Sequence, residues 1–483
     1  MNSSNSLRVL VFTAGVAAIL AVMSLLMPKD GVSIGDVKLK FLSAEQIVSA
    51  KKQEIKDISS IVSSVNTKET EEKKLIKHKN ITNGGVGAPQ IVNYEMNRAS
   101  QFSLSSTGMK ALRNFFKKLE RAAVDKKKIH ILHFGDSQIE GDRMTSFIRQ
   151  RMQEKFGGYG PGLIAANNIY PTLSYRQSYS PNFVRYTCFG GAKLSNKQYG
   201  VMNSAARFTS ESVDSNATVQ DAWITIGPDN RAHSRAQSFN KVNMFYNSCE
   251  VSCLLQVESN GKIIHEEYLV TDGNSHVVKL VFGRTPESLK FNFKSVKSPN
   301  IVGFSCEGDY GVQVDNIAMR GSSGTFFSSV NRNSFKKMLN DLNTELTILQ
   351  FGGNSMPYLK DSASVRKAAT YFKGQIQTLK SLKPDMAIVM IGPSDMSKLK
   401  NGAYETYPLL EYHISQLKKA ALDAGAGYWN LFDAMGGKNS MPAWVEKDLG
   451  RTDHVHFSLK GATIAAQLFY DAFMSEYLKF EGK

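Results

Sequence analysis

The sequence predicts an α/β fold: a parallel sheet with helices on both faces, interrupted by an inserted antiparallel β-sandwich and preceded by a transmembrane helix. Strand-like and helix-like segments alternate before residue 163 and after residue 311, which indicates a parallel sheet covered on both faces. Between these points, short alternating apolar runs dominate, as in a sandwich. Near the first residue, a long segment carries no charge.

The chain length of 483 residues suggests two or three domains, and a hydrophobic content of 42% is enough to build their cores. We expect a signal anchor at 1–30 and a charged linker at 31–95. The α/β domain is expected to be split into a segment at 96–163 and a segment at 311–483, with the inserted sandwich at 164–310 between them.

The uncharged segment Val9–Met27 has nineteen residues, just enough to span a bilayer. No convincing cleavage site follows it, which favours an uncleaved anchor in the inner membrane. Arg8 precedes it, so the positive-inside rule places the bulk of the chain outside the cytoplasm, in the periplasm. The following Lys-, Glu- and Ser-rich stretch, Ser43–Gly87, is typical of a linker.

In the first segment of the α/β domain, apolar residues at helical spacing predict a helix over 108–126. The apolar run Ile129–Phe134 predicts a buried strand, and a second helix is expected over about 140–156. A glycine-rich break at 157–162 ends it.

In the insert, the pair Asn260-Gly261 between two strand-like runs predicts a β-hairpin. Further strands are expected at 223–226, 242–246, 276–282 and 289–293. After the insert, we expect strands at 312–319, 346–351, 386–391 and 427–431, and helices at 335–342, 363–382, 409–424 and 459–480.

The net charge of +16 comes from lysines and arginines spread over the chain, without a nucleic-acid-binding motif. We therefore expect no nucleic-acid partner. Cys249 and Cys253 cannot pair within one strand, because four strand residues span about 13 Å and a disulfide needs Cα atoms within about 7 Å. A bridge to Cys306, or four reduced thiols including Cys188, both stay open.

Ser137 is the candidate nucleophile, because it lies in Gly135-Asp136-Ser137-Gln138, directly after the predicted strand 129–134. A strand followed by a turn and a helix places this side chain at the carboxyl edge of the sheet, where open α/β sheets carry out their chemistry. A helix N-cap is the structural alternative for the serine. Asp136 is expected to hold the turn.

His456 is the candidate base, and Asp453 is the acid that would orient it, since a spacing of three residues lets a carboxylate reach the imidazole. His454 and His456 also form a His-x-His pair, but further metal ligands are not evident, so we expect no metal. Asp395 and Asp433 follow other strands and are alternative acids.

An oxyanion hole needs hydrogen-bond donors close to the nucleophile. Asn354 follows the predicted strand 346–351 and could donate its amide. Gly321 follows the strand 312–319 and could donate its backbone N–H, with Gly190-Gly191 as a competitor.

Taken in chain order, Ser137, Gly321, Asn354 and Asp453 with His456 resemble the four sequence blocks of the SGNH (GDSL) hydrolase superfamily. The resemblance implies a flavodoxin-like sheet, a Ser–His–Asp triad, and an oxyanion hole made of the Ser137 N–H, the Gly321 N–H and the Asn354 amide. It implies no cofactor. Gln138 departs from the family's common leucine.

The β insert, the run Asp433–Gly437 with Trp444, and the stretch Asp453–Phe457 are similar to periplasmic peptidoglycan O-acetylesterases. That resemblance implies a carbohydrate-binding-like insert, an O-acetylated glycan as substrate and an acetyl-serine intermediate. A membrane-bound O-acyltransferase is an expected partner. An O-acetyltransferase using the same residues, and a non-catalytic glycan-binding envelope protein, are the alternatives.

Overall fold

The computed structural model describes residues 3–26, 32–34, 37–39, 55–65 and 101–482, apart from 213 and 215. The first described elements are helix α1 (Ser3–Leu26) and the antiparallel pair β1 (Val32–Ile34) and β2 (Val37–Leu39).

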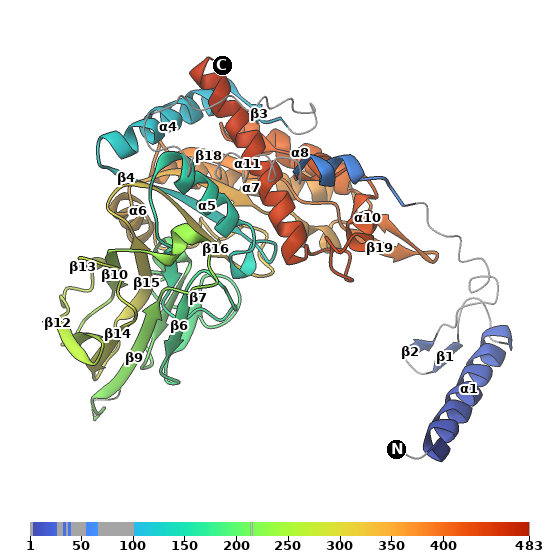
Figure 1. The fold of residues 1–483 in the computed structure, drawn as a ribbon, viewed down its shortest axis with the longest axis horizontal. Helices are drawn as coiled ribbons and strands as arrows, with labels where there is room; N and C mark the ends of the chain where they lie inside the picture. Colours follow the sequence, from blue (N-terminus) through green and yellow to red (C-terminus); the bar gives the residue numbers. More distant parts are fainter. Residues whose placement is uncertain are drawn as a thin grey trace, which may run out of the picture.

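The central sheet has the strand order β16-β4-β17-β18-β21-β3. Its first five strands are parallel, and β3 runs antiparallel to β21 at one edge (Figure 1). The strands are β3 (Ser103–Leu104), β4 (Lys128–Gly135), β16 (Gly311–Ala318), β17 (Thr344–Gln350), β18 (Ala387–Ile391) and β21 (Gly427–Trp429). Strands β4 and β17 are buried along nearly all of their length, the polar residues together with the apolar ones.

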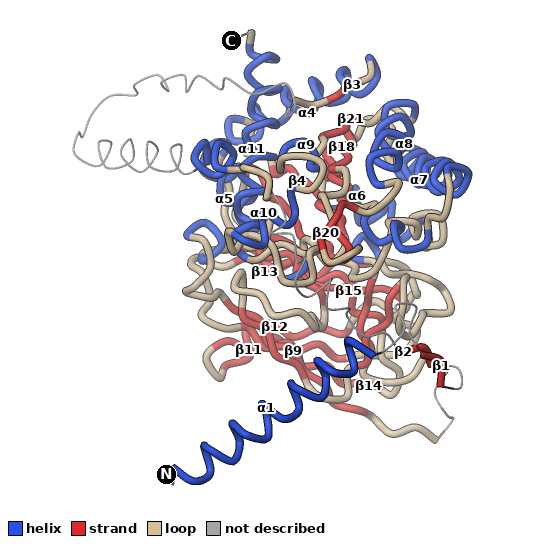
Figure 2. Tube along the Cα trace, turned by 90° about the vertical axis from the view of Figure 1, so that its right-hand side faces the viewer, coloured by secondary structure: helices blue, strands red, loops and turns tan. Residues whose placement is uncertain are grey.

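Helices cover both faces of this sheet, with α4, α5 and α11 on one side and α6, α7 and α8 on the other (Figure 2). Their bounds are α4 (Ser106–Val124), α5 (Thr145–Phe156), α6 (Arg332–Asp341), α7 (Ser362–Leu382), α8 (Leu410–Asp423) and α11 (Leu459–Glu481). Short helices η2 (Glu140–Asp142), η5 (Gly353–Tyr358), α9 (Leu431–Ala434) and α10 (Ser440–Glu446) lie in the connections. The Ser458 hydroxyl caps α11 by accepting from the Gly461 N–H, which fixes where the last helix begins.

Two antiparallel sheets pack face to face around their own apolar core between the two segments of the α/β domain. The outer sheet has the order β12-β11-β14-β9-β6: β6 (Arg176–Tyr179), β9 (Gln220–Gly227), β11 (Leu254–Ser259), β12 (Lys262–Tyr268) and β14 (Leu289–Ser295). The inner sheet has the order β13-β10-β15-β8-β7, with β5 beside β15: β5 (Gly162–Ala165), β7 (Val184–Thr187), β8 (Ser204–Arg207), β10 (Lys241–Asn247), β13 (His276–Val281) and β15 (Asn300–Glu307). Short helices η3 (Gly200–Met202) and η4 (Ser234–Gln237) complete this region.

The predicted hairpin joins β11 to β12, with Asn260 at φ 50° and Gly261 at φ 75°. Two consecutive positive φ angles are what a two-residue hairpin turn of this kind requires, so this prediction is confirmed.

The inner sheet is buried on both faces where it meets the α/β domain. At this junction the imidazole of His130 on β4 lies between two carboxylates, 2.9 Å from Glu307 and 2.7 Å from Asp315. Lys128 approaches Glu307 at 2.5 Å, so two cations face two carboxylates. Burial lowers the pKa of His130, but the two carboxylates outweigh it and raise that pKa to about 9.

The predicted fold class is wrong in its transmembrane helix and in its parallel sheet, which also contains the antiparallel edge strand β3. Helix α1 forms, but within the described residues none of the helices combines the length and apolarity needed to cross a membrane. The prediction for Val9–Met27 relied on absent charge, and the run includes Thr13, Gly15 and several alanines, which add little apolar surface.

The sheets are also more numerous than predicted, and the architecture is mixed. The two-residue strand β3 is too short to leave a pattern in the sequence. A further antiparallel pair, β19 (Ser397–Lys400) and β20 (Ala403–Thr406), was missed although Asn401-Gly402 between them is a hairpin signal.

A short stretch within the predicted linker is described and buried. Ile58 is fully buried and Val65 nearly so, and both belong to the core beneath α4, α5 and α11. Lys447 donates to the Ser59 hydroxyl at 3.1 Å. The four cysteines are free, and burial raises the pKa of the Cys188 and Cys253 thiols to about 12.

Candidate active site

Ser137 lies where three parallel strands end together. Gly135, the last residue of β4, is in register with Ala318 of β16 on one side and Gln350 of β17 on the other. The chain then turns, and the Asp136 carboxylate accepts from the Gln138 N–H at 2.9 Å, which confirms its predicted role in holding the turn. The turn leads into η2 and α5, as the sequence pattern predicts.

The structure brings the three predicted triad residues together. The Oγ of Ser137 lies 2.8 Å from Nε2 of His456, and Nδ1 of His456 lies 2.8 Å from an oxygen of Asp453. A carboxylate can only accept, so Nδ1 carries the imidazole hydrogen and Nε2 is free to accept from the serine hydroxyl. This arrangement can remove a proton from Ser137.

A tight loop holds the base. The backbone N–H groups of Val455 and His456 both donate to Asp453 at 2.9 Å, and the Arg451 N–H donates to the His456 carbonyl at 2.7 Å. Partial burial raises the pKa of Asp453, but the hydrogen bonds from His456 and Val455 outweigh it and lower that pKa. His454 points elsewhere, since its ring stacks on that of Tyr404 with the centroids 3.4 Å apart.

Two backbone donors and one amide meet beside Ser137. Ser137, Gly321 and Asn354 all line the same cleft. Within the described residues of the chain, the N–H groups of Ser137 and Gly321 have no acceptor. Gly321 has φ 76°, a left-handed conformation that glycine adopts without strain.

Both amide hydrogens of Asn354 have acceptors, the Asp136 carboxylate at 3.0 Å and the Ser322 carbonyl at 3.1 Å. Burial raises the pKa of Asp136 to about 6. To donate to a substrate oxygen, the Asn354 amide therefore has to exchange one of these two partners.

The competing candidates lie in other contacts. Asp395 is fully buried and accepts from the Thr406 hydroxyl at 2.7 Å and the Met441 N–H at 2.8 Å, so it ties β20 to α10. Asp433 accepts from Asn430 at 2.5 Å. Gly190 and Gly191 are not among the residues that line the cleft.

Sequence reasoning missed two side chains that connect the serine turn to the base loop. Gln138 donates to the Val455 carbonyl at 2.7 Å and accepts from the Phe457 N–H at 3.3 Å, so it is hydrogen-bonded to the backbone on both sides of His456. Arg143 donates to the carbonyls of Ser137 and Phe457. The sequence held one weak signal, the departure at Gln138 from the family's leucine.

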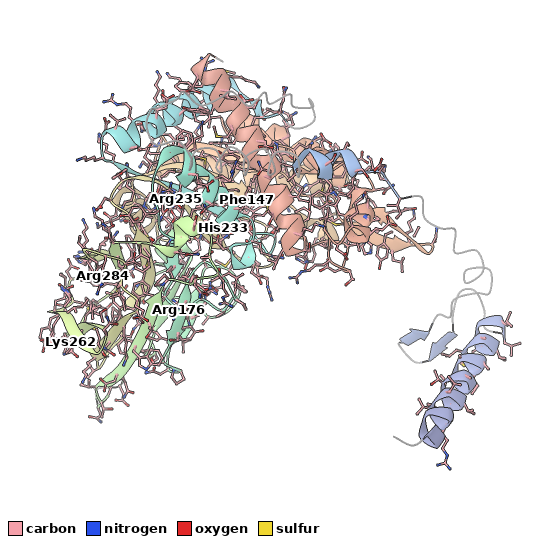
Figure 3. All side chains as sticks on the ribbon, viewed as in Figure 1. Phe147, Arg176, His233, Arg235, Lys262 and Arg284 are labelled. Carbon is pink, nitrogen blue, oxygen red and sulfur yellow. The ribbon has the colours of Figure 1, made fainter. Side chains whose placement is uncertain are left out.

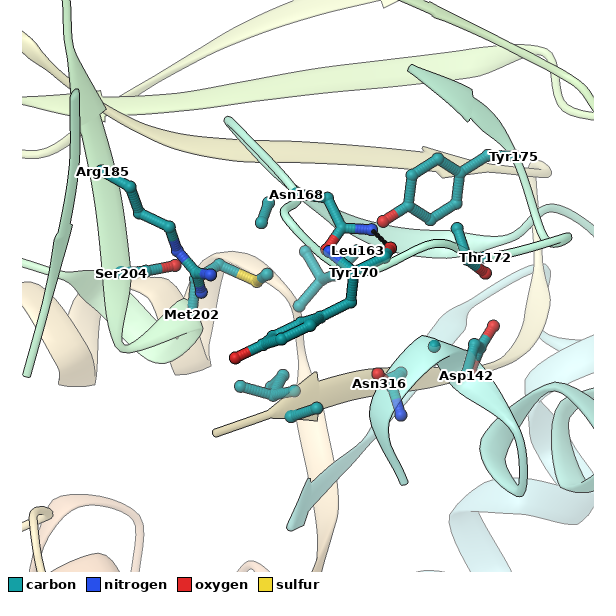
Figure 4. A pocket seen from close by; sticks show the side chains of 14 residues that line it. Asp142, Leu163, Asn168, Tyr170, Thr172, Tyr175, Arg185, Met202, Ser204 and Asn316 are labelled. Carbon is teal, nitrogen blue, oxygen red and sulfur yellow. Dashed lines mark hydrogen bonds between the residues drawn. The ribbon is translucent and has the colours of Figure 1, made fainter. Parts of the chain in front are cut away.

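The cleft around these residues has a volume of about 850 Å³, and the inserted region forms one wall of it through Pro171, Thr172, Leu173 and Arg231. Beside the cleft, a cavity of about 40 Å³ separates Tyr170 and Arg185 of that region from Asp142 and Asn316 (Figure 4). The guanidinium of Arg320 lies 5.1 Å from the Tyr170 ring centroid, which fastens this wall to the end of β16.

Comparison with family models and with curated proteins gives no match. Among solved structures, one described as "Peptidoglycan O-acetylesterase in action, 5 min" is similar at a TM-score of 0.59 and 20% identity, over 77% of this chain and 97% of that chain.

Two carbohydrate esterases, both of carbohydrate esterase family two, are also similar. One, from Clostridium thermocellum, has a TM-score of 0.23 and 11% identity over 60% of this chain and 97% of that chain. The other, from Cellvibrio japonicus, has a TM-score of 0.25 and 8% identity over 63% of this chain and 98% of that chain. TM-scores this low do not establish a shared fold.

The likeness to the first structure concerns the fold, and it covers nearly all of that esterase. The chain is therefore similar in fold to a peptidoglycan O-acetylesterase, as expected from its resemblance to that group within the SGNH hydrolases.

Proposed function

We propose that this protein is an SGNH-type serine esterase that removes O-acetyl groups from a cell-wall or surface polysaccharide outside the cytoplasm. The observation that carries the proposal is the unbroken Ser137–His456–Asp453 chain, with 2.8 Å at each step. The shared fold with a peptidoglycan O-acetylesterase supports the choice of an acetylated glycan as substrate.

In this mechanism, His456 accepts the hydroxyl proton as Oγ of Ser137 attacks the acetyl carbonyl. The negative oxygen of the tetrahedral intermediate accepts from the unpaired N–H groups of Ser137 and Gly321. The Asn354 amide joins them by exchanging one of its two present partners. His456 then gives the proton to the departing sugar oxygen, which leaves an acetyl ester on Ser137. Water, deprotonated by His456, releases acetate.

The experiment is acetate release by the full chain from p-nitrophenyl acetate and from O-acetylated peptidoglycan. Ser137→Ala should lose at least about a thousandfold in kcat, because the covalent route is gone. Equal rates for the wild type and this variant would refute the proposed nucleophile. Adding an unacetylated sugar acceptor separates hydrolysis from transfer, since a transferase would yield acetylated acceptor in place of acetate.

Two further expectations stay predictions: binding of glycan by the inserted β-region, and a partnership with an O-acyltransferase that acetylates the same polysaccharide.

A further inference from the structure

The cleft around Ser137 is rich in arginine. Among the described residues, its lining contains four guanidinium groups and two carboxylates: Arg143, Arg231, Arg320 and Arg451, with Glu140 and Asp453. A neutral acetyl ester gives no reason for such an excess of positive charge.

Two of these arginines are neutralised by carboxylates. Arg320 holds Glu140 through two hydrogen bonds of 2.6 and 2.5 Å. Arg231 holds Asp229 through two of 3.0 and 2.7 Å. Asp453 is already committed to His456, so the lining offers no further carboxylate to the other two arginines.

Arg143 has no carboxylate as a hydrogen-bond partner among the described residues. Its guanidinium donates to carbonyls, those of Glu140, Ser137 and Phe457. Burial lowers the pKa of Arg143, and the positive charges of Arg451 and Arg320 lower it further, against the opposite effects of Glu140 and Asp136. The region between Arg143 and Arg451 is therefore positively charged.

Arg451 is exposed, and its guanidinium has no acceptor within the described chain, although its backbone N–H is bonded to the His456 carbonyl at 2.7 Å. That bond holds the Arg451 backbone next to the base, and Arg451 lines the cleft. Its five N–H donors are available to a ligand.

We propose that Arg451 binds a carboxylate carried by the glycan close to the acetylated hydroxyl, so that the enzyme selects acidic polysaccharide. This inference rests on the proposed function. A planar guanidinium matches a carboxylate in a two-bond fork, as Arg320 and Arg231 already do at this cleft. The positive charge of Arg143, which lines the same cleft, adds to the attraction.

The test uses one O-acetylated oligosaccharide with a uronic acid next to the acetylated sugar, and the same compound with that carboxylate reduced to an alcohol. For the wild type, KM for the acidic compound should be about tenfold lower, as one charge-assisted hydrogen-bonded pair provides. Arg451→Gln should raise KM for the acidic compound to the value for the reduced one. Arg451→Lys should keep some of the preference.

Arg284→Gln is the matched control, because Arg284 is an exposed arginine in the inserted region that does not line the cleft (Figure 3). It should keep the full preference. Higher salt should reduce the wild-type preference, and this measurement needs no variant.

Equal kcat/KM for both compounds in the wild type would overturn the inference, and so would a preference that survives in Arg451→Gln. A stronger preference for a phosphorylated counterpart would overturn the assignment to carboxylate. If the proposed function itself fails, acetate is released neither from p-nitrophenyl acetate nor from either oligosaccharide. If only this inference fails, acetate is still released, but at equal kcat/KM from both oligosaccharides.

Discussion

The hydroxyl of Ser137 and the imidazole of His456 lie 2.8 Å apart although 319 positions separate them in the chain. The contact exists because β4 and the loop before α11 meet at one edge of the sheet. The side chain of Gln138 and that of Arg143 fasten the two segments to each other.

Asp453→Asn should reduce kcat by about 10³ to 10⁴, because an amide in place of the carboxylate favours the wrong imidazole tautomer and no longer stabilises the imidazolium. Steady-state kinetics on p-nitrophenyl acetate measures this. Asp433→Asn is the control, since Asp433 contacts Asn430 and not His456. A larger loss in the control than in Asp453→Asn would mean that the orienting acid is assigned wrongly.

Gln138→Leu introduces the residue common in the SGNH hydrolases that the sequence resembles, and it should lower kcat about tenfold, with KM nearly unchanged. The variant removes the bonds to the Val455 carbonyl and the Phe457 N–H, so His456 is held less firmly relative to Ser137. Gln138→Glu should restore at most the accepting bond. A Gln138→Leu variant with wild-type kcat and a wild-type melting temperature would show that these two hydrogen bonds have no catalytic effect.

Asn354→Ala should lower kcat about a hundredfold, the usual effect of losing one oxyanion donor. The amide now donates to Asp136 and Ser322, so it has to turn toward the substrate oxygen during the reaction. The measurement is kcat and KM on p-nitrophenyl acetate. A change of less than twofold in kcat would mean that the amide keeps its present partners and that the N–H groups of Ser137 and Gly321 act alone.

The free energy of unfolding should fall at alkaline pH because of the cluster formed by His130, Glu307 and Asp315. The pKa of His130 is about 9 in the folded chain, above its ordinary value of 6.5. Its protonated form therefore stabilises the fold fully below pH 6.5, and this contribution is lost as pH rises through about 9. His130→Gln should cost about 3 kcal/mol near pH 6.5, because Asp315 and Glu307 stay buried without it.

Denaturant unfolding from pH 6 to pH 10 measures this dependence. His276→Gln is the control, because His276 pairs with the single carboxylate of Asp272 near the surface. Curves for the wild type and His130→Gln that run parallel over this range would contradict the assignment.

Much of the central sheet could be predicted from the sequence, because strands buried on both faces appear as continuous apolar runs such as Ile129–Phe134. The antiparallel strand β3 could not, since its two residues carry no period. The membrane helix was predicted wrongly, because absence of charge is a weaker criterion than apolarity. The burial of Ile58 within a charged segment was also beyond the sequence, since isolated apolar residues do not show what they pack against.

The residues of the site and the order of its triad could be predicted from the chain order and the strand ends, but the other contacts of the site could not. The sequence does not show that Asn354 donates to Asp136, because the two residues follow separate strands, β17 and β4, which only folding brings side by side. The excess of positive charge in the cleft could not be predicted from the sequence either, since Arg143, Arg231 and Arg451 come from three distant segments.

The distance in sequence between nucleophile and base has a consequence for biosynthesis. The ribosome delivers Ser137 early, and His456 follows only after the whole inserted region and the other four parallel strands, β16, β17, β18 and β21. A growing chain therefore carries a bare serine without its base, and any premature stop before residue 456 yields a product with no means of activating it. The proposed ester cleavage therefore depends on synthesis of the chain through residue 456.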